Sequence, residues 1–375
     1  MAFIKKTDDT IEKLRILAND SKYDLACACA TRADEHRRRS ASNKWIYPVI
    51  TPGGGRTYLF KTLLSNKCVN DCIYCPLRAV SNTPRCSLTP EALAKAFLSY
   101  VALGKVSGLF LSSAVDAGPD ASMERINRTA LLLRRQQFRG YIHLKIIPGA
   151  SEAAIRQSLA LASAVSLNIE APGENNFKRL CTSKDYTRDV LRPIRLISSL
   201  TAPGTGLQRV KHTTQFVVGA AQETDREIID YSWKLYKEMQ LDRVYFSAYQ
   251  RVGGLEAQED SRPGNGDLLT REHRLYQVDF LIRKYGFKAQ EIPLDAHGNL
   301  SLKVDPKEAW ARKHPEFFPV NVNTADKFRL LRVPGVGQVL ADRIIQFRQN
   351  TKIRAMRDIG PANKLLQKAG NYIVF

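Results

Sequence analysis

The chain has 375 residues, and its 57 lysines and arginines outnumber 37 aspartates and glutamates, which gives a formal net charge of +20 at pH 7. Hydrophobic residues make up 44% and charged residues 25%, as in globular proteins that bury a core. No apolar run approaches the roughly 18 residues of a membrane span, so the composition excludes a membrane-spanning protein. The charge favours a polyanionic partner, either nucleic acid or an anionic surface, with a basic subunit of a larger assembly as the alternative.

Residues 1–56 predict an N-terminal extension. An amphipathic helix is expected at 7–20, and the basic run at 32–44 predicts a solvated loop, or else an arm that contacts phosphates. Cys27 and Cys29, one residue apart, have a poor chelating spacing and are expected to be buried small residues. The segment has no apolar stretch typical of a signal peptide, so we expect a cytoplasmic protein. Clustered cysteines then indicate metal or redox ligands.

From residue 57 to residue 286 the pattern predicts strands that alternate with helices. Strands are expected at 57–64, 106–113, 141–148, 164–171, 211–220 and 242–249. Helices are expected at 87–104, 122–138, 151–162, 185–200, 224–239 and 270–286. This alternation indicates an α/β fold with a parallel sheet, either a partial or full barrel or an open doubly wound sheet. In each of these folds, ligands bind at the C-terminal ends of the strands.

Three of the seven cysteines, Cys68, Cys72 and Cys75, lie in the stretch KCVNDCIYCP, directly after the first predicted strand. A structural zinc site normally has four ligands, and the downstream Cys86 and His143 complete no familiar zinc spacing. Iron–sulfur clusters are usually held by four cysteines, so three leave one iron open to an exogenous ligand. Zinc, a disulfide and chance remain the alternatives to a cluster.

The C-x-x-x-C-x-x-C spacing, with Tyr74 just before the third cysteine, resembles the signature of the radical S-adenosylmethionine superfamily. The resemblance implies a (β/α)6 partial TIM barrel in which Cys68, Cys72 and Cys75 hold a 4Fe–4S cluster. It also implies that S-adenosylmethionine chelates the open iron through its amino and carboxylate groups. Reductive cleavage then yields a 5′-deoxyadenosyl radical that abstracts hydrogen from the substrate, with electrons from a donor such as flavodoxin or ferredoxin.

The same resemblance implies cofactor contacts at other strand ends. Ser112 and Ser113 occupy the position of a Gly-Gly-Glu-like motif that contacts the amino group of the cofactor, and they depart from its acidic pattern. Asn168 and Glu170 share one face of a strand, where the family places polar residues on the ribose or carboxylate. Ordinary polarity at a strand end is the alternative for this pair.

Two further stretches offer candidate residues. Gly219 and Glu223 in VVGAAQET resemble the adenine-contacting segment of the family, although glutamate is also favoured at a helix N-terminus. Cys181 follows the fourth predicted strand and is either a hydrogen-atom donor or a buried small residue. His143 and Lys145 alternate on the third strand and could face the barrel interior, or else have a structural role.

Residues 287–317 lack clear periodicity and predict a connector, whereas residues 318–375 predict a small all-α domain. Two helices are expected there, the first capped by Asn323 or Thr324, with the turn VPGVG between them. Glycines in this turn expose backbone N–H groups at a helix N-terminus, where they can bind a phosphate oxygen without reading sequence.

This C-terminal segment resembles the helix–hairpin–helix motif of DNA-binding and DNA-repair proteins. The resemblance implies nucleic-acid contacts by Lys327, Arg332, Gly335, Val336, Gly337 and Arg343. A helical hairpin that packs against protein is the alternative. Iron–sulfur DNA glycosylases also combine such a hairpin with a cluster, but their four cysteines follow the hairpin, whereas three precede it here.

Over nearly its full length, the chain resembles a family of radical S-adenosylmethionine proteins assigned to DNA modification or repair. The stretches CVNDCIYC, FLSSAVDAG, LNIEAPGE and RVPGVG carry this resemblance, and ACACATRADEHRRR departs from it. It implies an enzyme that modifies or repairs DNA, without implying the reaction. An RNA-modifying enzyme and a non-catalytic, nucleic-acid-binding iron–sulfur protein are the alternatives.

Overall fold

The computed structural model describes residues 9–21, 45–50, 54–250 and 265–375. Cys27 and Cys29 and the basic run at 32–44 therefore lie outside the described residues. The chain divides into two compact units. The barrel unit comprises residues up to 223 and residues 234–268, and the C-terminal unit comprises residues 224–233 and 269–375.

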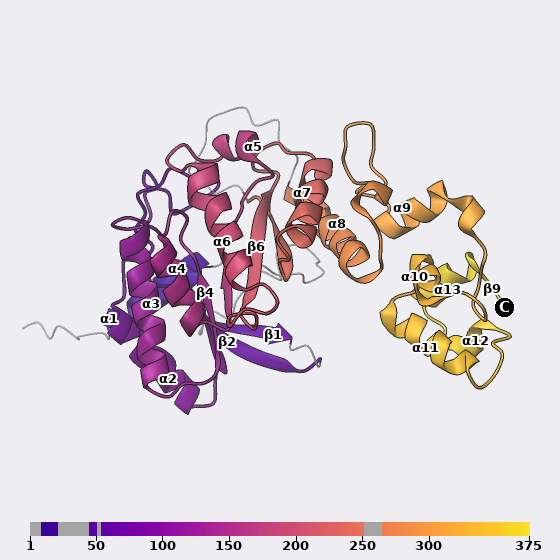
Figure 1. The fold of residues 1–375 in the computed structure, drawn as a ribbon, viewed down its shortest axis with the longest axis horizontal. Helices are drawn as coiled ribbons and strands as arrows, with labels where there is room; N and C mark the ends of the chain where they lie inside the picture. Colours follow the sequence, from indigo (N-terminus) through magenta and orange to yellow (C-terminus); the bar gives the residue numbers. More distant parts are fainter. Residues whose placement is uncertain (1–8, 22–44, 51–53, 251–264) are drawn as a thin grey trace, which may run out of the picture. The chain divides into compact units, whose positions relative to one another are not determined.

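A seven-stranded sheet, curled into a half-barrel, forms the barrel unit (Figure 1). Its strands are β1 (Ile46–Ile50), β2 (Arg56–Leu63), β3 (Gly108–Ser112), β4 (Tyr141–Lys145), β5 (Ala164–Ser166), β6 (Lys211–Val218) and β7 (Arg243–Ala248). Strands β2 to β7 are parallel and pair in chain order. This consecutive order confirms the six predicted strands and selects a partial barrel over a doubly wound sheet, whose strand order reverses.

Strand β1 is antiparallel to β2 at the edge of the sheet, and the sequence did not predict it. Its sequence IYPVI contains Pro48, which has no N–H to donate and is tolerated only at a sheet edge. These residues were expected to belong to the N-terminal extension. They form an edge strand of the sheet instead, where a proline is tolerated.

The helices of the barrel unit cover the outer, convex face of the sheet (Figure 1). They include α1 (Asp9–Asp20), α2 (Pro90–Ala102), α3 (Pro119–Arg135), α4 (Glu152–Leu161), α5 (Glu174–Lys178) and α6 (Arg192–Leu200), with a π-helical turn at Tyr186–Leu191. Thr89 caps α2, and Pro90 occupies its first turn, as predicted. None of the helices in the described part of the chain has the length and apolar content of a bilayer span.

Side chains alternate along each strand, so the sheet has one face that packs against helices and one face that is open. Leu109 and Leu111 of β3 and Ile142 and Leu144 of β4 are fully buried beneath the helices. The residues between them face the concave side, where they line two cavities. The hydrophobic core of this unit thus lies between sheet and helices, and the barrel interior is left for other uses.

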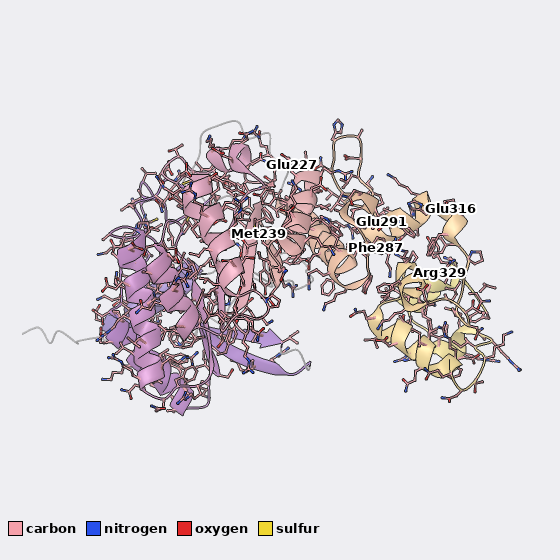
Figure 2. The ribbon with its side chains drawn as sticks, in the orientation of Figure 1. Glu227, Met239, Phe287, Glu291, Glu316 and Arg329 are labelled. Atoms are coloured by element: carbon pink, nitrogen blue, oxygen red, sulfur yellow. The ribbon has the colours of Figure 1, made fainter. Side chains whose placement is uncertain are left out.

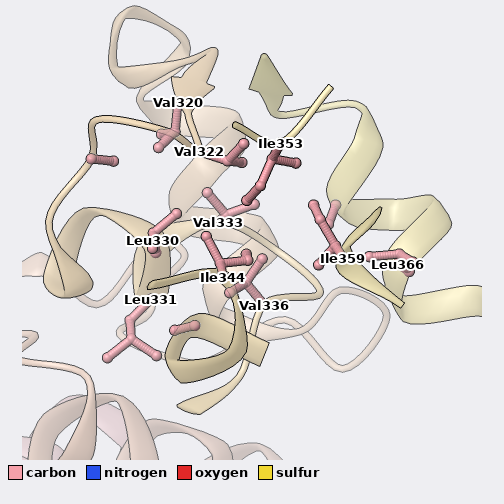
Figure 3. Close-up of a cluster of buried hydrophobic side chains, with 13 residues drawn as sticks. Val320, Val322, Leu330, Leu331, Val333, Val336, Ile344, Ile353, Ile359 and Leu366 are labelled. Carbon is pink, nitrogen blue, oxygen red and sulfur yellow. The ribbon is translucent and has the colours of Figure 1, made fainter. Parts of the chain in front are cut away.

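Helices α7 (Asp225–Lys237) and α8 (Asn265–Lys284) each contribute residues to both units, and the elements that follow belong to the C-terminal unit. Those elements are α9 (Pro306–Lys313), β8 (Val320–Asn321), α10 (Lys327–Arg332), α11 (Gln338–Arg348), α12 (Met356–Ile359), α13 (Lys364–Gly370) and β9 (Ile373–Val374). Leu330, Val333, Val336 and Ile344 lie at the centre of its small core (Figure 3).

The segment predicted as a connector contains helix α9, whose N-cap is Asp305. Contacts group residues 269–317 with the C-terminal unit rather than between two domains. The N-cap of α10 is Asp326, whose side chain accepts from the Arg329 N–H, and not Asn323 or Thr324 as predicted. Asn323 instead binds the backbone of Ile353, which fixes the loop before α12.

Candidate cluster site and candidate nucleic-acid interface

The three clustered cysteines lie in the loop that follows β2, at the C-terminal rim of the parallel strands. Cys68, Cys72 and Cys75 line one cavity of about 190 Å³. Among the described residues, no three Cys, His, Asp or Glu side chains converge as they would on a single metal ion. A multi-iron cluster does not require such convergence, because each cysteine binds a different iron.

Five of the predicted cofactor-binding residues line the same cavity: Tyr74, Ser112, Ser113, Asn168 and Glu170. The Asn168 amide donates to a carboxylate oxygen of Glu170 at 3.4 Å, and the Tyr74 hydroxyl is near enough to this carboxylate to influence its pKa. Burial raises the pKa of both Glu170 and Tyr74, although nearby Lys145 opposes the shift at Glu170. A polar, hydrogen-bonding wall therefore faces the cysteines.

Gly219 and Glu223 do not belong to the residues that line this cavity. The carboxylate of Glu223 accepts from the N–H of Gly219 at 2.5 Å and from the N–H of Ala221 at 3.0 Å. Gly219 has a φ of +85°, which favours glycine. These contacts stabilise the turn after β6, so both residues have a structural role in the described conformation.

Asp71, which the sequence did not single out, anchors the cysteine loop to the segment after β5. Its carboxylate accepts from the Ser183 hydroxyl at 2.7 Å, from the backbone N–H groups of Thr182 and Ser183, and from the Cys181 thiol at 3.1 Å. Burial opposes ionisation of Asp71, but the hydrogen bonds from Thr182, Cys181 and Ser183 outweigh it and hold its pKa well below its usual range.

Cys181 and Lys184 also contact the cysteine loop. The Sγ atoms of Cys181 and Cys72 are 3.5 Å apart, and the Lys184 amino group lies 3.1 Å from Cys72 Sγ. The hydrogen bond from Cys181 and the charge of Lys184 lower the pKa of Cys72 to about 6 against the effect of burial, whereas burial raises that of Cys75 to about 12. The sequence brought Cys181 near this rim, but only the fold shows its contact with Cys72.

The three cysteine thiols fit an iron–sulfur cluster that takes one further ligand from outside the protein. Three thiols supply three of the four positions that iron–sulfur clusters normally take up. The cavity beside them presents hydroxyl, amide and carboxylate groups that could bind the amino and carboxylate ends of an amino-acid cofactor. Lys145 and Lys184 line the same cavity and add positive charge that a carboxylate would complement.

In the C-terminal unit, the predicted hairpin joins α10 and α11. Gly335 has a φ of +88°, and a Cβ atom there would lie 2.1 Å from the carbonyl oxygen of Leu365 in α13. Gly337 is the N-cap of α11, and Val336 is buried in the core. Gly335 is therefore required for close packing against α13. Of Gly335, Val336 and Gly337, it is Gly337 that lies at the N-terminus of α11.

The predicted cations of the hairpin differ in their surroundings. Lys327 pairs with Asp342 at 2.5 Å on the surface, and Arg343 is exposed and reaches the Ile359 carbonyl at 3.4 Å. Residues 318–375 contain ten lysines and arginines and three aspartates, which gives this segment a net charge of +7. Sequence inspection missed four exposed members of this set: Lys352, Arg354, Arg357 and Lys364.

Arg332 does not extend from the hairpin into solvent. Its guanidinium carbon lies 4.3 Å from the ring centre of Phe287 and 4.7 Å from that of Trp310, and it pairs with Glu291 at 2.7 Å. Phe287 and Glu291 belong to the segment after α8 (Figure 2). In this position Arg332 connects the hairpin to the segment after α8, and most of its side chain is enclosed by these contacts.

Comparisons with solved structures give distant similarities. The FeFe-hydrogenase maturase HydG from Carboxydothermus hydrogenoformans is 15% identical with a TM-score of 0.46, over 59% of this chain and 51% of that one. SuiB of Streptococcus suis, bound to S-adenosylmethionine, is 12% identical with a TM-score of 0.45, over 61% and 49%. Methylornithine synthase PylB is 16% identical with a TM-score of 0.46, over 72% and 76%.

The chain spans about half the length of the first two of these proteins. No curated protein matches the chain. Residues 317–369 match a family model described as "Helix-hairpin-helix motif", which covers α10 to α13 together with the hairpin between α10 and α11.

Proposed function

We propose that the protein is a radical S-adenosylmethionine enzyme that modifies or repairs nucleic acid, with DNA as the substrate. The observation that carries the proposal is the single cavity that Cys68, Cys72 and Cys75 share with Asn168 and Glu170 at the rim of a half-barrel. Three thiols beside a polar cavity suit a cluster that leaves one iron for a cofactor.

Each part of the rim has a proposed task. Cys68, Cys72 and Cys75 would hold the cluster, and Asp71 would keep their loop in place. Glu170 and Asn168 would orient the cofactor through their oxygen and amide atoms. When bound, the cluster and S-adenosylmethionine supply the radical chemistry, while the protein positions and shields the reacting atoms.

The nucleic-acid part of the proposal rests on the helix–hairpin–helix match and on the net charge of +7 in residues 318–375. Such hairpins contact the phosphate backbone without reading sequence. A base that reacts inside the half-barrel would have to be single-stranded or flipped out of the duplex. Repair of a lesion and modification of an intact base both meet this requirement.

Anaerobic reconstitution with iron and sulfide tests the enzyme directly. We expect an iron–sulfur absorption spectrum that changes when S-adenosylmethionine is added, and release of 5′-deoxyadenosine under a reductant. Deuterated DNA and RNA oligonucleotides then identify the substrate, because deuterium is transferred into 5′-deoxyadenosine only from the correct one. Bound iron with neither spectral change nor cleavage would exclude the enzyme.

The contact between Cys181 and Cys72 favours one second candidate, a nucleic-acid-binding protein with a closed cluster. A fourth thiol 3.5 Å from a cluster cysteine could complete four-cysteine ligation. In that case the cluster would have no open iron, and S-adenosylmethionine would leave its spectrum unchanged. Reconstituted Cys181→Ser separates the candidates: loss of the cluster supports closed ligation, and retention supports the enzyme.

A further inference from the structure

The hairpin between α10 and α11 is engaged by other residues of the C-terminal unit. A Cβ atom at Gly335 would lie 2.1 Å from the Leu365 carbonyl oxygen and 3.1 Å from the Ala369 nitrogen, so α13 covers this residue. Val336 is buried, and its carbonyl accepts from the Lys307 amino group at 2.5 Å. The first half of the hairpin therefore packs against protein.

The second half of the hairpin, at the N-terminus of α11, contacts the end of α8. The side-chain amide of Gln338 donates to the Lys284 carbonyl at 3.3 Å. Burial raises the pKa of Tyr285, and the backbone of Gln338 lies near enough to the tyrosine hydroxyl to oppose this shift. A Cβ atom at Gly337 would lie 3.4 Å from the same hydroxyl. A phosphate at this helix terminus would thus compete with Tyr285.

A different part of the C-terminal unit carries cations without acidic partners. Between residues 343 and 364 the sequence contains six lysines and arginines but one carboxylate, that of Asp358. Arg348 is held by the carbonyls of Val322 and Ala325 at 2.9 and 2.6 Å. The other five are exposed and form no ion pair with any residue that the structure describes: Arg343, Lys352, Arg354, Arg357 and Lys364.

Helix α12 brings these five cations together, and we call them the α12 surface. The helix packs against α11 (Figure 1). The Arg343 guanidinium, from α11, reaches the Ile359 carbonyl at 3.4 Å, and a Cβ atom at Gly360 would lie 2.8 Å from the same guanidinium. Lys352, Arg354 and Arg357 precede or belong to α12, and Lys364 begins α13 after the loop 360–363.

The one acidic residue does not neutralise the α12 surface. The Asp358 carboxylate accepts from the backbone N–H groups of Arg354 and Ala355 at 2.9 and 3.0 Å, which caps the start of α12. These hydrogen bonds hold the pKa of Asp358 below its usual range. Five cations and one carboxylate leave the surface with a net charge of +4.

The composition of this surface favours a duplex over a single strand. Residues 350–370 contain no Phe, Trp or Tyr. Proteins that hold single strands stack the bases on such rings, whereas duplex binding depends on cations that neutralise phosphates. Three of the five cations are arginines, whose planar guanidinium can bind two phosphate oxygens at once.

We infer that the α12 surface, rather than the amides of the hairpin, binds the phosphate backbone of duplex DNA. This inference rests on the proposed function, because it names the face on which the substrate of that enzyme docks. The contacts go to phosphates, so binding does not depend on sequence. The hairpin then has a structural role, since it joins α10 to the helix on which α12 packs.

Binding of a fluorescent duplex at several salt concentrations tests the α12 surface. The full-length protein is used without a cluster, so the result is independent of any reaction with S-adenosylmethionine. Each neutralised phosphate contributes about 0.9 to the slope of log affinity against log salt. In the triple variant Arg354→Gln, Arg357→Gln, Lys364→Gln we expect the slope to fall by about 2.7 and the affinity at about 0.1 M salt to fall roughly 100-fold.

A matched triple variant is the control for net charge. Lys95→Gln, Lys105→Gln, Lys303→Gln removes the same amount of charge at exposed positions away from α12 and should keep the wild-type slope. Equal losses in the two triple variants would show that net charge alone attracts the duplex, and would overturn the inference. The single variants Arg354→Gln and Lys364→Gln, each expected to lower the slope by about 0.9, serve if the triple variant fails to fold.

Gly337→Ala separates the α12 surface from the hairpin. The added Cβ atom fits at 3.4 Å from its nearest neighbour, but it would obstruct a phosphate at the N-terminus of α11. We expect wild-type affinity for the duplex. Weakened binding in Gly337→Ala, with an unchanged slope in the triple variant at α12, would return the contact to the hairpin. A single strand bound as tightly as the duplex would contradict the assignment to duplex DNA.

The inference and the proposed function fail in different measurements. Duplex binding that depends on the α12 surface, with no cleavage of S-adenosylmethionine by the reconstituted wild-type protein, would retain the surface and reject the radical enzyme. Cleavage together with unchanged duplex binding in the triple variant at α12 would retain the enzyme and reject the surface.

Discussion

The side-chain amino group of Lys307 donates at 2.8 Å to the carbonyl oxygen of Leu331, a residue of α10 near the hairpin between α10 and α11. It also donates to the carbonyl of Val336 at 2.5 Å and lies 4.7 Å from the ring centre of Tyr285. Lys307 is 8% exposed and belongs to α9, outside the segment that matches the helix–hairpin–helix model. Lys307, a residue of the predicted connector, thus stabilises the conformation of the hairpin through these two hydrogen bonds.

Lys307→Met is expected to lower the free energy of unfolding by about 2–4 kcal/mol, because two buried carbonyls lose their donor. DNA affinity should fall as the hairpin loosens, while the dependence of affinity on salt stays the same, since Lys307 is not a phosphate contact. Urea unfolding and binding at several salt concentrations measure the two effects. Lys313→Met, on the same helix but exposed, is the control, and a reduced salt dependence in Lys307→Met would contradict this role.

Replacement by alanine should affect stability at Arg332 and DNA binding at Arg343. Arg332→Ala removes a side chain held by Phe287, Trp310 and Glu291 and should lower stability by about 1–3 kcal/mol. Arg343→Ala should leave stability unchanged but reduce the salt dependence of DNA binding by about one ion. The reverse pattern would assign the phosphate contact to Arg332.

Asp71→Ala tests the anchor of the cysteine loop. Its carboxylate accepts from several donors in residues 181–183, so its loss should free the loop before the cluster binds. We expect cluster affinity to fall about tenfold, as for other residues that orient metal ligands. Iron content after reconstitution gives the measurement, and Glu91→Gln, an exposed change on α2, provides the control. Wild-type iron content in Asp71→Ala would show that the loop needs no anchor.

Serine variants of individual cysteines identify the cluster ligands. Cys68→Ser, Cys72→Ser and Cys75→Ser should each remove most of the bound iron, whereas Cys86→Ser should not, because Cys86 does not line the cavity. In the proposed enzyme Cys181→Ser also retains the cluster, since three thiols are sufficient. Absorption spectra and iron analysis of the five variants measure this directly.

Periodicity and spacing predicted much of the fold from the sequence. Six of the strands, the order of helices between them and the cap of α2 by Thr89 follow from local preferences that tertiary contacts reinforce. The cysteine loop and the strand ends carrying Ser112 and Glu170 could be placed together because parallel strands end on one rim.

Contacts between distant segments could not be read in the same way. Asp71 is an ordinary loop aspartate in the sequence, and only the fold brings residues 181–183 to its carboxylate. Arg332 has the charge of a phosphate contact, but the aromatic rings that enclose it are 22 and 45 positions away in the chain. Glu223 matched a motif, yet its carboxylate is occupied by its own turn.

His212 on β6 makes the stability of the barrel unit depend on pH. Its ring is 2% exposed, and within the described residues neither ring nitrogen has a hydrogen-bond partner. Burial lowers its pKa from 6.5 to about 4, despite the opposing charge of Asp242. The unfolded chain therefore binds a proton at a higher pH than the folded chain does, so acidification through this interval favours unfolding.

Between about pH 7 and about pH 5, His212 should cost the folded state about 2 kcal/mol. His212→Phe cannot be protonated and should lose this part of the pH dependence, whereas His297→Gln, at an exposed position, should keep it. Urea unfolding followed by circular dichroism at both pH values gives the comparison. If His212→Phe and the wild type lost equal stability on acidification, the imidazole would bind its proton at the same pH in the folded and unfolded chain, and burial would not lower its pKa.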